Sequence, residues 1–369
     1  MADTVQVDAI ILGAGIAGLS CADAVLQKGR TCAVIDLNQP GEGTSGSPGM
    51  LVNPATGRRA KKSWKAKESF GLIHDLLKRV QDETDQSFFE KNGVIRPALT
   101  EKLTNNFERS PEKYNWPDDW IEWLPEYDFS ERFPVFENHF GGLFVKKAMT
   151  VNGTVFMRAF AEFLTKRDII TEFETEYQLW QEKSNWIAET KDGSKYQSDV
   201  VIDATGYNQV HSDHWNFLNL HPVKGQTATF FFDEPLPLHS SISSLGYMAF
   251  LTDHPKQITV GSTYEHDFDH LKIDQDGLKY LKNKLEKTLP GWVEKSSSVE
   301  QWSGVRVTVQ DRKPVIGAHP EKKGLYIIGA LGSKGLLMGR LLAEMLVENI
   351  LKGLKIENIV SSERFFKVK

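Results

Sequence analysis

The chain begins with an alternation of apolar runs and glycine turns that predicts a strand, a helix and a second strand. DAIIL at 8–12 is a short apolar run, and GAGIAGLS at 13–20 supplies a turn. LSCADAVLQKG at 19–29 has the apolar spacing of a helix, and TCAVID at 31–36 is again rich in strand-forming residues. Further along, VVIDATG at 200–206 predicts another strand followed by a glycine turn. Near the end, the pattern predicts a strand at 325–329, a turn, and a long helix from about Gly335.

A different pattern fills the third quarter of the chain. KGQTATFFF, YMAFLTD and QITVGSTYE, all within 223–300, alternate apolar and polar positions, and DGLKYLKNKLEKTL has helical spacing. These segments predict an antiparallel sheet with a helix. Upstream, Trp116, Trp120 and Trp123 stand at i, i+4 and i+7. If 116–123 is helical they share one face, and such a stripe is more typical of packing than of stacking on nucleic-acid bases.

Composition narrows the class of protein. A length of 369 residues suits two intimately packed domains. The net charge of −5 and the pI near 6.1 argue against a surface built as a whole for nucleic acid. Cys21 and Cys32 are too few for a disulfide framework, and the N-terminus shows neither a signal peptide nor a membrane segment. We therefore expect a cytoplasmic location.

The first turn carries the strongest chemical signal. Gly13, Gly15 and Gly18 fit GxGxxG, with Ile16 and Ala17 between the last two, directly after a strand. In this motif the glycines permit the tight turn, the approach of a pyrophosphate, and close helix packing. Asp36 ends the second strand, where a carboxylate can accept hydrogen bonds from a ribose and disfavours the 2′-phosphate of NADP. The motif predicts dinucleotide binding without separating NAD from FAD.

Two further glycine-rich segments favour FAD. The loop at 43–49 follows the second strand, where an NAD enzyme would normally continue with a helix. The helix beginning near Gly335 would aim its positive end at a flavin ring. The predicted contacts from these and neighbouring segments are Leu37, Thr44, Ser45, Gly46, Gly49, Met50, Leu51, Tyr177, Ala204, Thr205, Gly206, Gly332, Ser333, Lys334, Gly335 and Leu336.

These motifs, in this order, resemble the FAD-dependent D-amino-acid oxidase (DAO) superfamily. The resemblance extends from GAGIAGLS through GTSGSPGM, VVIDATG, GSTYE and GVRVTVQDRKPVIG to GALGSKGLL. It implies an α/β fold with a Rossmann-like FAD-binding domain and a second, antiparallel-sheet substrate domain. We expect the first domain to comprise 1–75, 141–222 and 303–369, and the second 76–140 and 223–302.

Within the superfamily, the wording is most similar to the oxidase domain of the bifunctional tRNA 5-methylaminomethyl-2-thiouridine biosynthesis protein. The opening Lys224, Gly225, Gln226 and the ALGSKGL stretch carry this likeness. It implies oxidation of a secondary amine that bears a carboxymethyl group, with release of glyoxylate. Because residue 1 stands directly before the flavin fingerprint, we expect the methyltransferase domain of the bifunctional enzyme to be absent. Lys334 stands where that family tends to have arginine.

Three residues are candidates for the chemistry. Arg306 matches the arginine that grips substrate carboxylates in many DAO enzymes, and the alternative is a structural ion pair, for example with Asp311. Lys334 could stabilise an anionic reduced flavin or an anionic substrate, and the alternative is a solvated loop lysine. The hydroxyl of Tyr247 could bond a carboxylate, although an ordinary strand tyrosine is the commoner meaning. No spacing of His, Asp or Glu indicates a metal site.

The function therefore has one leading hypothesis and several rivals. The leading hypothesis is an FAD amine oxidoreductase that transfers a hydride from a secondary amine or N-substituted glycine unit, which is an amino acid or the carboxymethylaminomethyl group of tRNA. An alternative is a small-molecule oxidase of D-amino acids, glycine or sarcosine that has no role on tRNA. The rivals are an NAD-dependent Rossmann dehydrogenase and a non-catalytic binding module that uses the basic segment at 58–67. If 58–66 is helical, Arg58, Lys61, Lys62 and Lys65 form one stripe, which is either a solvated face or a contact for an anionic substrate.

Overall fold

The structure is a computed structural model that describes residues 4–137 and 139–366. The first layer of its fold is a six-stranded sheet. All its strands run parallel except the edge strand β22, which pairs antiparallel to β23. Its strands, in spatial order, are β12 (Ile170–Glu172), β3 (Cys32–Ile35), β2 (Ala9–Leu12), β16 (Val201–Asp203), β23 (Leu325–Gly329) and β22 (Val315–Ala318). The three βα signals of the sequence therefore meet in one sheet.

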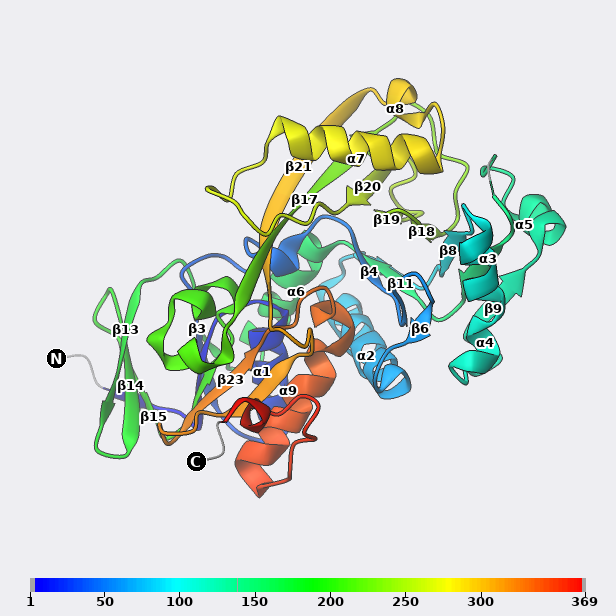
Figure 1. The fold of residues 1–369 in the computed structure, drawn as a ribbon. Helices are drawn as coiled ribbons and strands as arrows, with labels where there is room; N and C mark the ends of the chain where they lie inside the picture. Colours follow the sequence, from blue (N-terminus) through cyan, green and yellow to red (C-terminus); the bar gives the residue numbers. More distant parts are fainter. Residues whose placement is uncertain (1–3, 138, 367–369) are drawn as a thin grey trace.

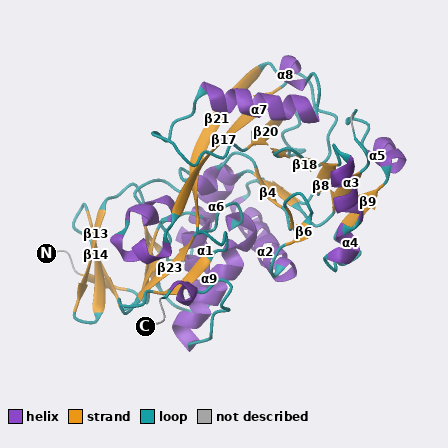
Figure 2. Ribbon diagram, in the orientation of Figure 1, coloured by secondary structure: helices purple, strands orange, loops and turns teal. Residues whose placement is uncertain are grey.

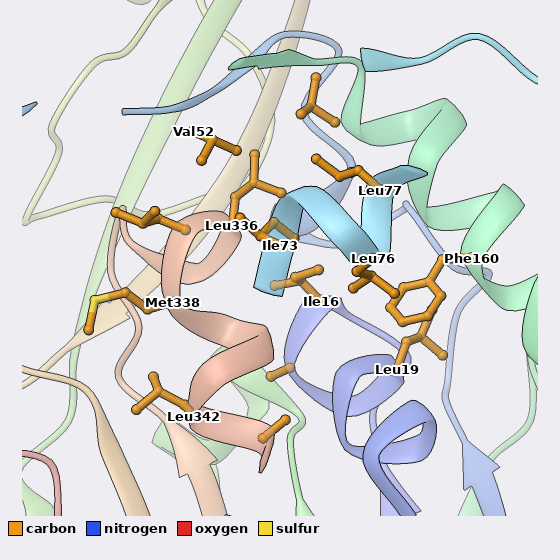
Figure 3. Packing of buried hydrophobic residues seen from close by; sticks show 14 of the residues in the cluster. Ile16, Leu19, Val52, Ile73, Leu76, Leu77, Phe160, Leu336, Met338 and Leu342 are labelled. Carbon is orange, nitrogen blue, oxygen red and sulfur yellow. The ribbon is translucent and has the colours of Figure 1, made fainter. Parts of the chain in front are cut away.

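The central strands are apolar on both faces, so both faces of this sheet must be covered. Helices cover one of them. The covering helices are α1 (Ile16–Leu26), α2 (Ala66–Thr84), α6 (Gly153–Thr165) and α9 (Gly335–Lys352). Their contact is a continuous apolar core in which Ile16 and Leu19 of α1 lie beside Leu76 of α2 and Leu336 of α9 (Figure 3). Burying each such side chain stabilises the fold by about 1.5–3 kcal/mol. The core fixes the start of α1 and the start of α9 next to each other.

On the opposite face of the six-stranded sheet lies a small four-stranded sheet. Its strands, in spatial order, are β1 (Thr4–Gln6), β15 (Lys195–Ser198), β14 (Asn185–Thr190) and β13 (Tyr177–Glu182). Short 3₁₀ turns at Gly206–His211 and Asp213–Leu218 follow β16. The indole nitrogen of the buried Trp215 donates to Asp203 at 2.7 Å and ties the second turn to the end of β16.

The second major layer is an eight-stranded sheet that stands above the first in Figure 1. Its strands are β21 (Ser298–Thr308), β17 (His221–Phe231), β20 (Gln257–Gly261), β19 (Tyr247–Ala249), β18 (Ser241–Ser243), β8 (Val94–Pro97), β10 (Gly142–Val145) and β9 (Ile121–Leu124). They pair antiparallel except for β18 and β8. The helices α7 (Gln275–Thr288) and α8 (Trp292–Lys295) lie over one face (Figure 2). The predicted antiparallel sheet with a helix is present.

Shorter elements complete the fold. They are the 3₁₀ turns at Thr44–Gly46 and Ser362–Phe365, β4 (Met50–Val52), β7 (Phe89–Glu90), β11 (Met149–Val151), and α3 (Glu101–Glu108), α4 (Ser110–Lys113) and α5 (Glu126–Arg132). β4, β11 and β7 form a three-stranded sheet. The predicted domain boundaries stay a prediction, and residues 1–3, 138 and 367–369 of those segments lie outside the described residues.

The predicted basic helix at 58–66 is wrong. β5 (Ala55–Thr56) and β6 (Lys61–Lys62) form a two-stranded hairpin, and α2 begins only at Ala66. The turn holds Gly57 and Ala60 at φ of +64° and +48°, a conformation incompatible with a right-handed helix. Arg96 donates to the carbonyls of Ala55 and Gly57 at 2.8 and 2.7 Å, so distant residues fix this hairpin.

The helical aromatic stripe is also wrong, although the packing role of its residues is confirmed. Trp116 and Trp120 are buried, with ring centroids 6.0 Å apart, but Trp123 lies on β9. Pro117 follows Trp116, and the residue before a proline is disfavoured in a helix. The indole nitrogen of Trp116 donates to the carbonyl of Ala60 at 3.2 Å, so this ring packs under the hairpin.

In the described part of the chain, no helix has the length and apolar character needed to cross a membrane.

Candidate functional site

A cavity of about 600 Å³ lies between the two major sheets. Its floor is formed by the turns after β2, β3, β16 and β23, at the carboxyl ends of the parallel strands. The chain leaves β2 for β3 on one side and later adds β16 on the other, so the cavity opens at the switch point where α/β sheets bind nucleotides. Its roof comes from β17, β19, β21 and the segment 262–264.

The first glycine turn forms a cradle that side chains would fill. Gly13 has φ of +100°, and a Cβ there would lie 2.5 Å from the carbonyl oxygen of Ala204. A Cβ on Gly18 would lie 1.8 Å from the carbonyl oxygen of Gly13. Gly13, Gly15, Ile16 and Ala17 line the cavity, whereas Gly18 does not and instead lets α1 pack on the turn. These are the separate roles that the motif assigns to its glycines.

Asp36 lies at the end of β3, with Leu37 beside it on the cavity wall. Its carboxylate accepts the backbone N–H of Ala14 at 2.5 Å and of Asn38 at 2.9 Å. Burial raises the pKa of Asp36, although these hydrogen bonds oppose the shift. Among the described residues it forms no salt bridge, so its remaining lone pairs are available to a ribose hydroxyl.

The second glycine-rich loop lies against the first turn. The Ser45 hydroxyl accepts the N–H of Ile16 at 3.0 Å, and the Thr44 hydroxyl donates to the carbonyl of Val305 at 2.6 Å. Thr44, Ser45, Met50 and Leu51 line the cavity, as predicted contacts should. Gly46 and Gly49 do not line it.

Close packing accounts for these two glycines. A Cβ on Gly46 would lie 1.6 Å from the carbonyl oxygen of Gly41, and one on Gly49 would lie 2.6 Å from the side chain of Thr259.

The C-terminal turn brings a helix end to the same cavity. Gly332, Ser333, Gly335 and Leu336 line it at the start of α9. Lys334 does not line it, because its Nζ donates to the carbonyl of Arg312 at 2.6 Å. Burial lowers the pKa of Lys334. The other predicted contacts, Tyr177, Ala204, Thr205 and Gly206, all line the cavity.

Arg306 lies on the roof of the cavity, on β21. Its Nη1 donates to the hydroxyl of Ser262 at 2.9 Å and its Nη2 to the carbonyl of Thr263 at 2.8 Å. The guanidinium carbon lies 4.4 Å from the ring centroid of Tyr264. The alternative pair with Asp311 is not formed, because Asp311 pairs with Arg364 at 3.0 Å. In the part of the chain that the structure describes, Arg306 has no carboxylate partner.

Tyr247 reaches the same cavity from β19, where it pairs with Gly261 of β20. A Cβ on Gly261 would lie 2.3 Å from the tyrosine ring, so the glycine makes room for it. Burial raises the pKa of Tyr247, and the charge of Arg306 acts in the opposite sense. The phenol therefore stays protonated near neutral pH and can donate a hydrogen bond.

Several lining residues were missed by sequence reasoning. Trp302 lies on β21 with its indole over Gly304, where a Cβ would come within 2.4 Å of the ring. Ser262, Tyr264 and Thr227 also line the cavity. Ser262 and Tyr264 belong to the motif GSTYE, which was recognised in the sequence. Only the folded structure shows that this motif contacts Arg306.

Lys284 of α7 is a further omission. It is buried behind the roof, and its Nζ donates to the carbonyl of Ser262 at 2.7 Å. Burial, with a smaller contribution from the charge of Arg306, lowers the pKa of Lys284 to about 8.

The residues present fit FAD. Backbone N–H groups of the first turn and hydroxyls of Thr44 and Ser45 surround the place for a pyrophosphate. The start of α9 presents a positive helix end to the same space, and Met50 and Leu51 provide an apolar wall for a flavin ring. Within the described residues, no group of three His, Cys, Asp or Glu side chains is placed to hold a metal ion.

Comparison with known proteins identifies relatives of this chain. The tRNA 5-methylaminomethyl-2-thiouridine biosynthesis bifunctional protein MnmC of Idiomarina loihiensis is 26% identical over 92% of this chain and 55% of its own length. The chain thus spans about half the length of several curated relatives that it matches.

Solved structures share the fold. The glycine oxidase of Geobacillus kaustophilus superposes with a TM-score of 0.81 at 20% identity, covering 96% of both chains. The iminodiacetate oxidase of Chelativorans sp. BNC1 superposes with a TM-score of 0.77 at 18% identity, covering 96% of this chain and 99% of the other. The model of the FAD dependent oxidoreductase family (DAO) matches residues 8–349, and the chain belongs to this family of FAD-dependent oxidoreductases.

Proposed function

We propose that the protein oxidises the C–N bond of an amine that carries a carboxymethyl group, with Arg306 holding the carboxylate. FAD, when bound, accepts the hydride from the carbon beside the nitrogen. The observation that carries the proposal is a guanidinium on the cavity roof whose partners are a hydroxyl and a carbonyl rather than an acid.

The hydrogen-bond count of Arg306 supports this role. A guanidinium has five N–H donors. The contacts to Ser262 and Thr263 use two of them, which leaves donors for both oxygens of a carboxylate. Because Tyr247 is protonated near neutral pH, it supplies a further donor to the same cavity from β19, another strand of the same sheet.

The lining of the cavity and the names of the similar proteins both indicate which kind of amine is the substrate. The cavity wall near Arg306 carries Tyr264 and Trp302, which suit a compact, partly apolar group at the nitrogen. Glycine oxidase and iminodiacetate oxidase are named for amines with a carboxymethyl group. We propose the same group here, with Lys334 outside the substrate contacts because its amine is bound to Arg312.

A second candidate is the same chemistry on tRNA. Arg58, Arg59 and Lys61 are exposed on the hairpin that follows Met50 and Leu51, and no salt bridge joins them to a described acid. Lys62 and Lys65 are engaged instead, with the carbonyl of Asn115 and with Glu357. A hairpin fixed by Arg96 presents its free cations in a set geometry, which suits a phosphate backbone. The printed name of MnmC concerns tRNA.

A cytoplasmic location is part of the same proposal, because Cys21 and Cys32 are both unpaired thiols.

Anaerobic flavin reduction tests the proposed function. The FAD-loaded protein is mixed separately with glycine, sarcosine, proline, iminodiacetate and tRNA containing carboxymethylaminomethyluridine, and the visible absorbance of flavin and the release of glyoxylate are followed. We expect at least one carboxymethyl amine to bleach the flavin and yield glyoxylate. Failure of all of them would overturn the proposal. Rapid bleaching by free amino acids and none by tRNA would remove the tRNA candidate.

A charge-removal variant tests the hairpin. Replacing Arg58, Arg59 and Lys61 together by Ala should weaken tRNA binding by about tenfold or more and flatten its salt dependence, since each lost phosphate contact lowers the salt slope by about 1. The matched control replaces three exposed lysines of other surfaces, Lys183, Lys287 and Lys355, by Ala. Equal tRNA affinity in both triple variants would return the hairpin to an ordinary solvated surface.

A further inference from the structure

A buried lysine behind the cavity roof has no part in the site described so far. Lys224 of β17 is 2% exposed and lies between two carboxylates. Its Nζ is 3.0 Å from Oε2 of Glu265 and 3.1 Å from Oδ2 of Asp274. Burial alone would lower the pKa of Lys224, but its hydrogen bonds to Glu265 and Asp274 outweigh that effect and raise it. The lysine is therefore a charged link between β17 and the loop that runs from Glu265 to the start of α7.

Gln226, two residues further along β17, contacts the same two carboxylates. Its Nε2 donates to Glu265 at 3.0 Å and to Asp274 at 2.7 Å, and its Oε1 accepts the backbone N–H of Asp274 at 2.9 Å. Asp274 also caps α7 by accepting the N–H of Gly277 at 2.7 Å. A Cβ on Gly277 would lie 2.5 Å from the Gln226 side chain, so the first turn of α7 packs directly on this amide.

The strand register changes where this link begins. Thr227 of β17 pairs with Gly261, whereas Lys224 pairs with Glu265, so three steps on one strand face four on the other. One extra residue in a strand is a β-bulge, a device that turns side chains in a new direction. The bulge covers Ser262 and Thr263, and these residues supply the hydroxyl and the carbonyl that accept from Arg306.

The backbone of the bulge is tied to the same two residues of β17. Thr263 N–H donates to the carbonyl of Gln226 at 3.1 Å, and the Gln226 N–H donates to the Thr263 hydroxyl at 2.8 Å. Lys224 and Glu265 exchange backbone hydrogen bonds of 2.9 and 3.0 Å. Between them, Gly225 leaves room for the guanidinium, since a Cβ there would lie 2.6 Å from Nη2 of Arg306.

We propose that Lys224 and Gln226 are positioning residues that hold the segment 262–265 in the bulged form and thereby orient Arg306 toward a substrate carboxylate. The inference rests on the proposed function, because it takes Arg306 as the carboxylate-binding group. When Lys224 is removed, no cation lies between the carboxylates of Glu265 and Asp274, and only the amide of Gln226 still bridges them. The repulsion between the two negative charges then releases the loop. Loss of the bulge then removes both acceptors that fix the guanidinium plane.

The test compares Lys224→Met with Lys224→Arg and with a control, all in the FAD-loaded full chain. Arginine keeps the charge and the donors, so Lys224→Arg should restore what Lys224→Met loses. The control is Arg340→Met, because Arg340 of α9 is also 2% exposed and also lies between two carboxylates, Asp23 and Glu344. It matches the burial and the lost charge without touching the roof.

Two measurements are made on each protein. Amide hydrogen exchange of peptides covering 262–274 measures how firmly this segment is held. The affinity for acetate, followed through the visible absorbance of the flavin, measures carboxylate binding. We expect Lys224→Met to speed exchange in 262–274 and to weaken acetate binding by about tenfold, the effect of losing a charge-assisted hydrogen bond. Lys224→Arg should behave like the wild type, and Arg340→Met should change neither quantity although it lowers global stability.

The outcomes separate the inference from the proposed function. If the wild type does not bind acetate, the proposed role of Arg306 fails, and hydrogen exchange alone then decides whether Lys224 holds the segment. Unchanged exchange in Lys224→Met would overturn the proposal that Lys224 holds the segment 262–265. Faster exchange with unchanged acetate affinity overturns the link to Arg306, and equal losses in Arg340→Met would show a general effect of removing a buried cation.

Discussion

At the scale of single residues, three cations at or behind the cavity roof have partners that differ in kind. Lys224 lies between carboxylates, whereas Arg306 is held by neutral oxygens and Lys284 by one carbonyl. A cation with neutral partners keeps most of its attraction for an incoming anion, because no fixed negative charge cancels it. The roof of the cavity is therefore suited to a carboxylate before any substrate arrives.

Replacing Arg306 by Lys keeps the charge and removes the planar fork. We expect kcat/KM for a carboxymethyl amine to fall by about 100-fold, the loss of two charge-assisted hydrogen bonds, with FAD content unchanged. Steady-state kinetics and the ratio of flavin to protein check this. An undiminished kcat/KM would show that another group binds the carboxylate.

Lys284 predicts a pH dependence of stability. Its pKa in the folded protein is about 8, against an ordinary value of 10.5, so between these pH values the unfolded chain binds more protons and stability rises with pH. Lys284→Met removes the cost of burying a charged lysine, so its gain in stability over the wild type should be largest below pH 8. That gain should shrink as the pH rises to 10. Urea denaturation at several pH values measures it. The control for removing a lysine from the same helix is Lys279→Met, at an exposed position.

At the scale of elements, the close contact between α1, the first turn and β16 depends on glycine. Gly18 belongs to α1, and its hydrogen atoms face the carbonyl of Gly13. Gly71 belongs to α2 and has no neighbouring atom within 4 Å of a built Cβ. Gly18 therefore has no room for a side chain, whereas Gly71 has room for one.

Gly18→Ala and Gly71→Ala form a matched pair. Gly18→Ala forces a methyl group into the Gly13 carbonyl and should cost about 3 kcal/mol of stability together with most FAD affinity. Gly71→Ala adds only helix propensity and should stabilise by about 0.5–1 kcal/mol. Chemical denaturation and FAD titration measure both. Similar stabilities in the two variants would contradict the packing role assigned to Gly18.

The sequence predicted those elements that have local signals. The βα units and the antiparallel sheet follow from apolar periodicity and glycine turns, and most predicted cofactor contacts line the cavity. The hairpin at 55–62 was missed because its shape comes from distant donors, Arg96, Ser110 and Trp116, that bind its carbonyls. The direction of Lys334 and the bulge at Ser262 were missed for the same reason, since both depend on partners far along the chain.

At the scale of the whole molecule, two long strands connect the cofactor end of the cavity with its roof. β17 and β21 pair over their full length, from His221 with Thr308 to Phe231 with Ser298, and they cross between the two layers in Figure 1. Val305, near one end of β21, accepts from Thr44 of the cofactor loop, and the next residue, Arg306, lies on the roof of the cavity. Strand β21 thus carries, at neighbouring residues, both a contact to the cofactor loop and the proposed carboxylate-binding group.

The most direct test of the central claim compares each carboxymethyl amine with its analogue that lacks the carboxyl group. Sarcosine is paired with dimethylamine, and tRNA carrying carboxymethylaminomethyluridine with tRNA carrying methylaminomethyluridine, and anaerobic flavin bleaching is timed for wild type and Arg306→Lys. The account predicts that the wild type reduces its flavin at least about 100-fold faster with the carboxylated member of the productive pair, and that Arg306→Lys loses most of this preference. Equal bleaching by both members of that pair, or a preference that survives in Arg306→Lys, would contradict it.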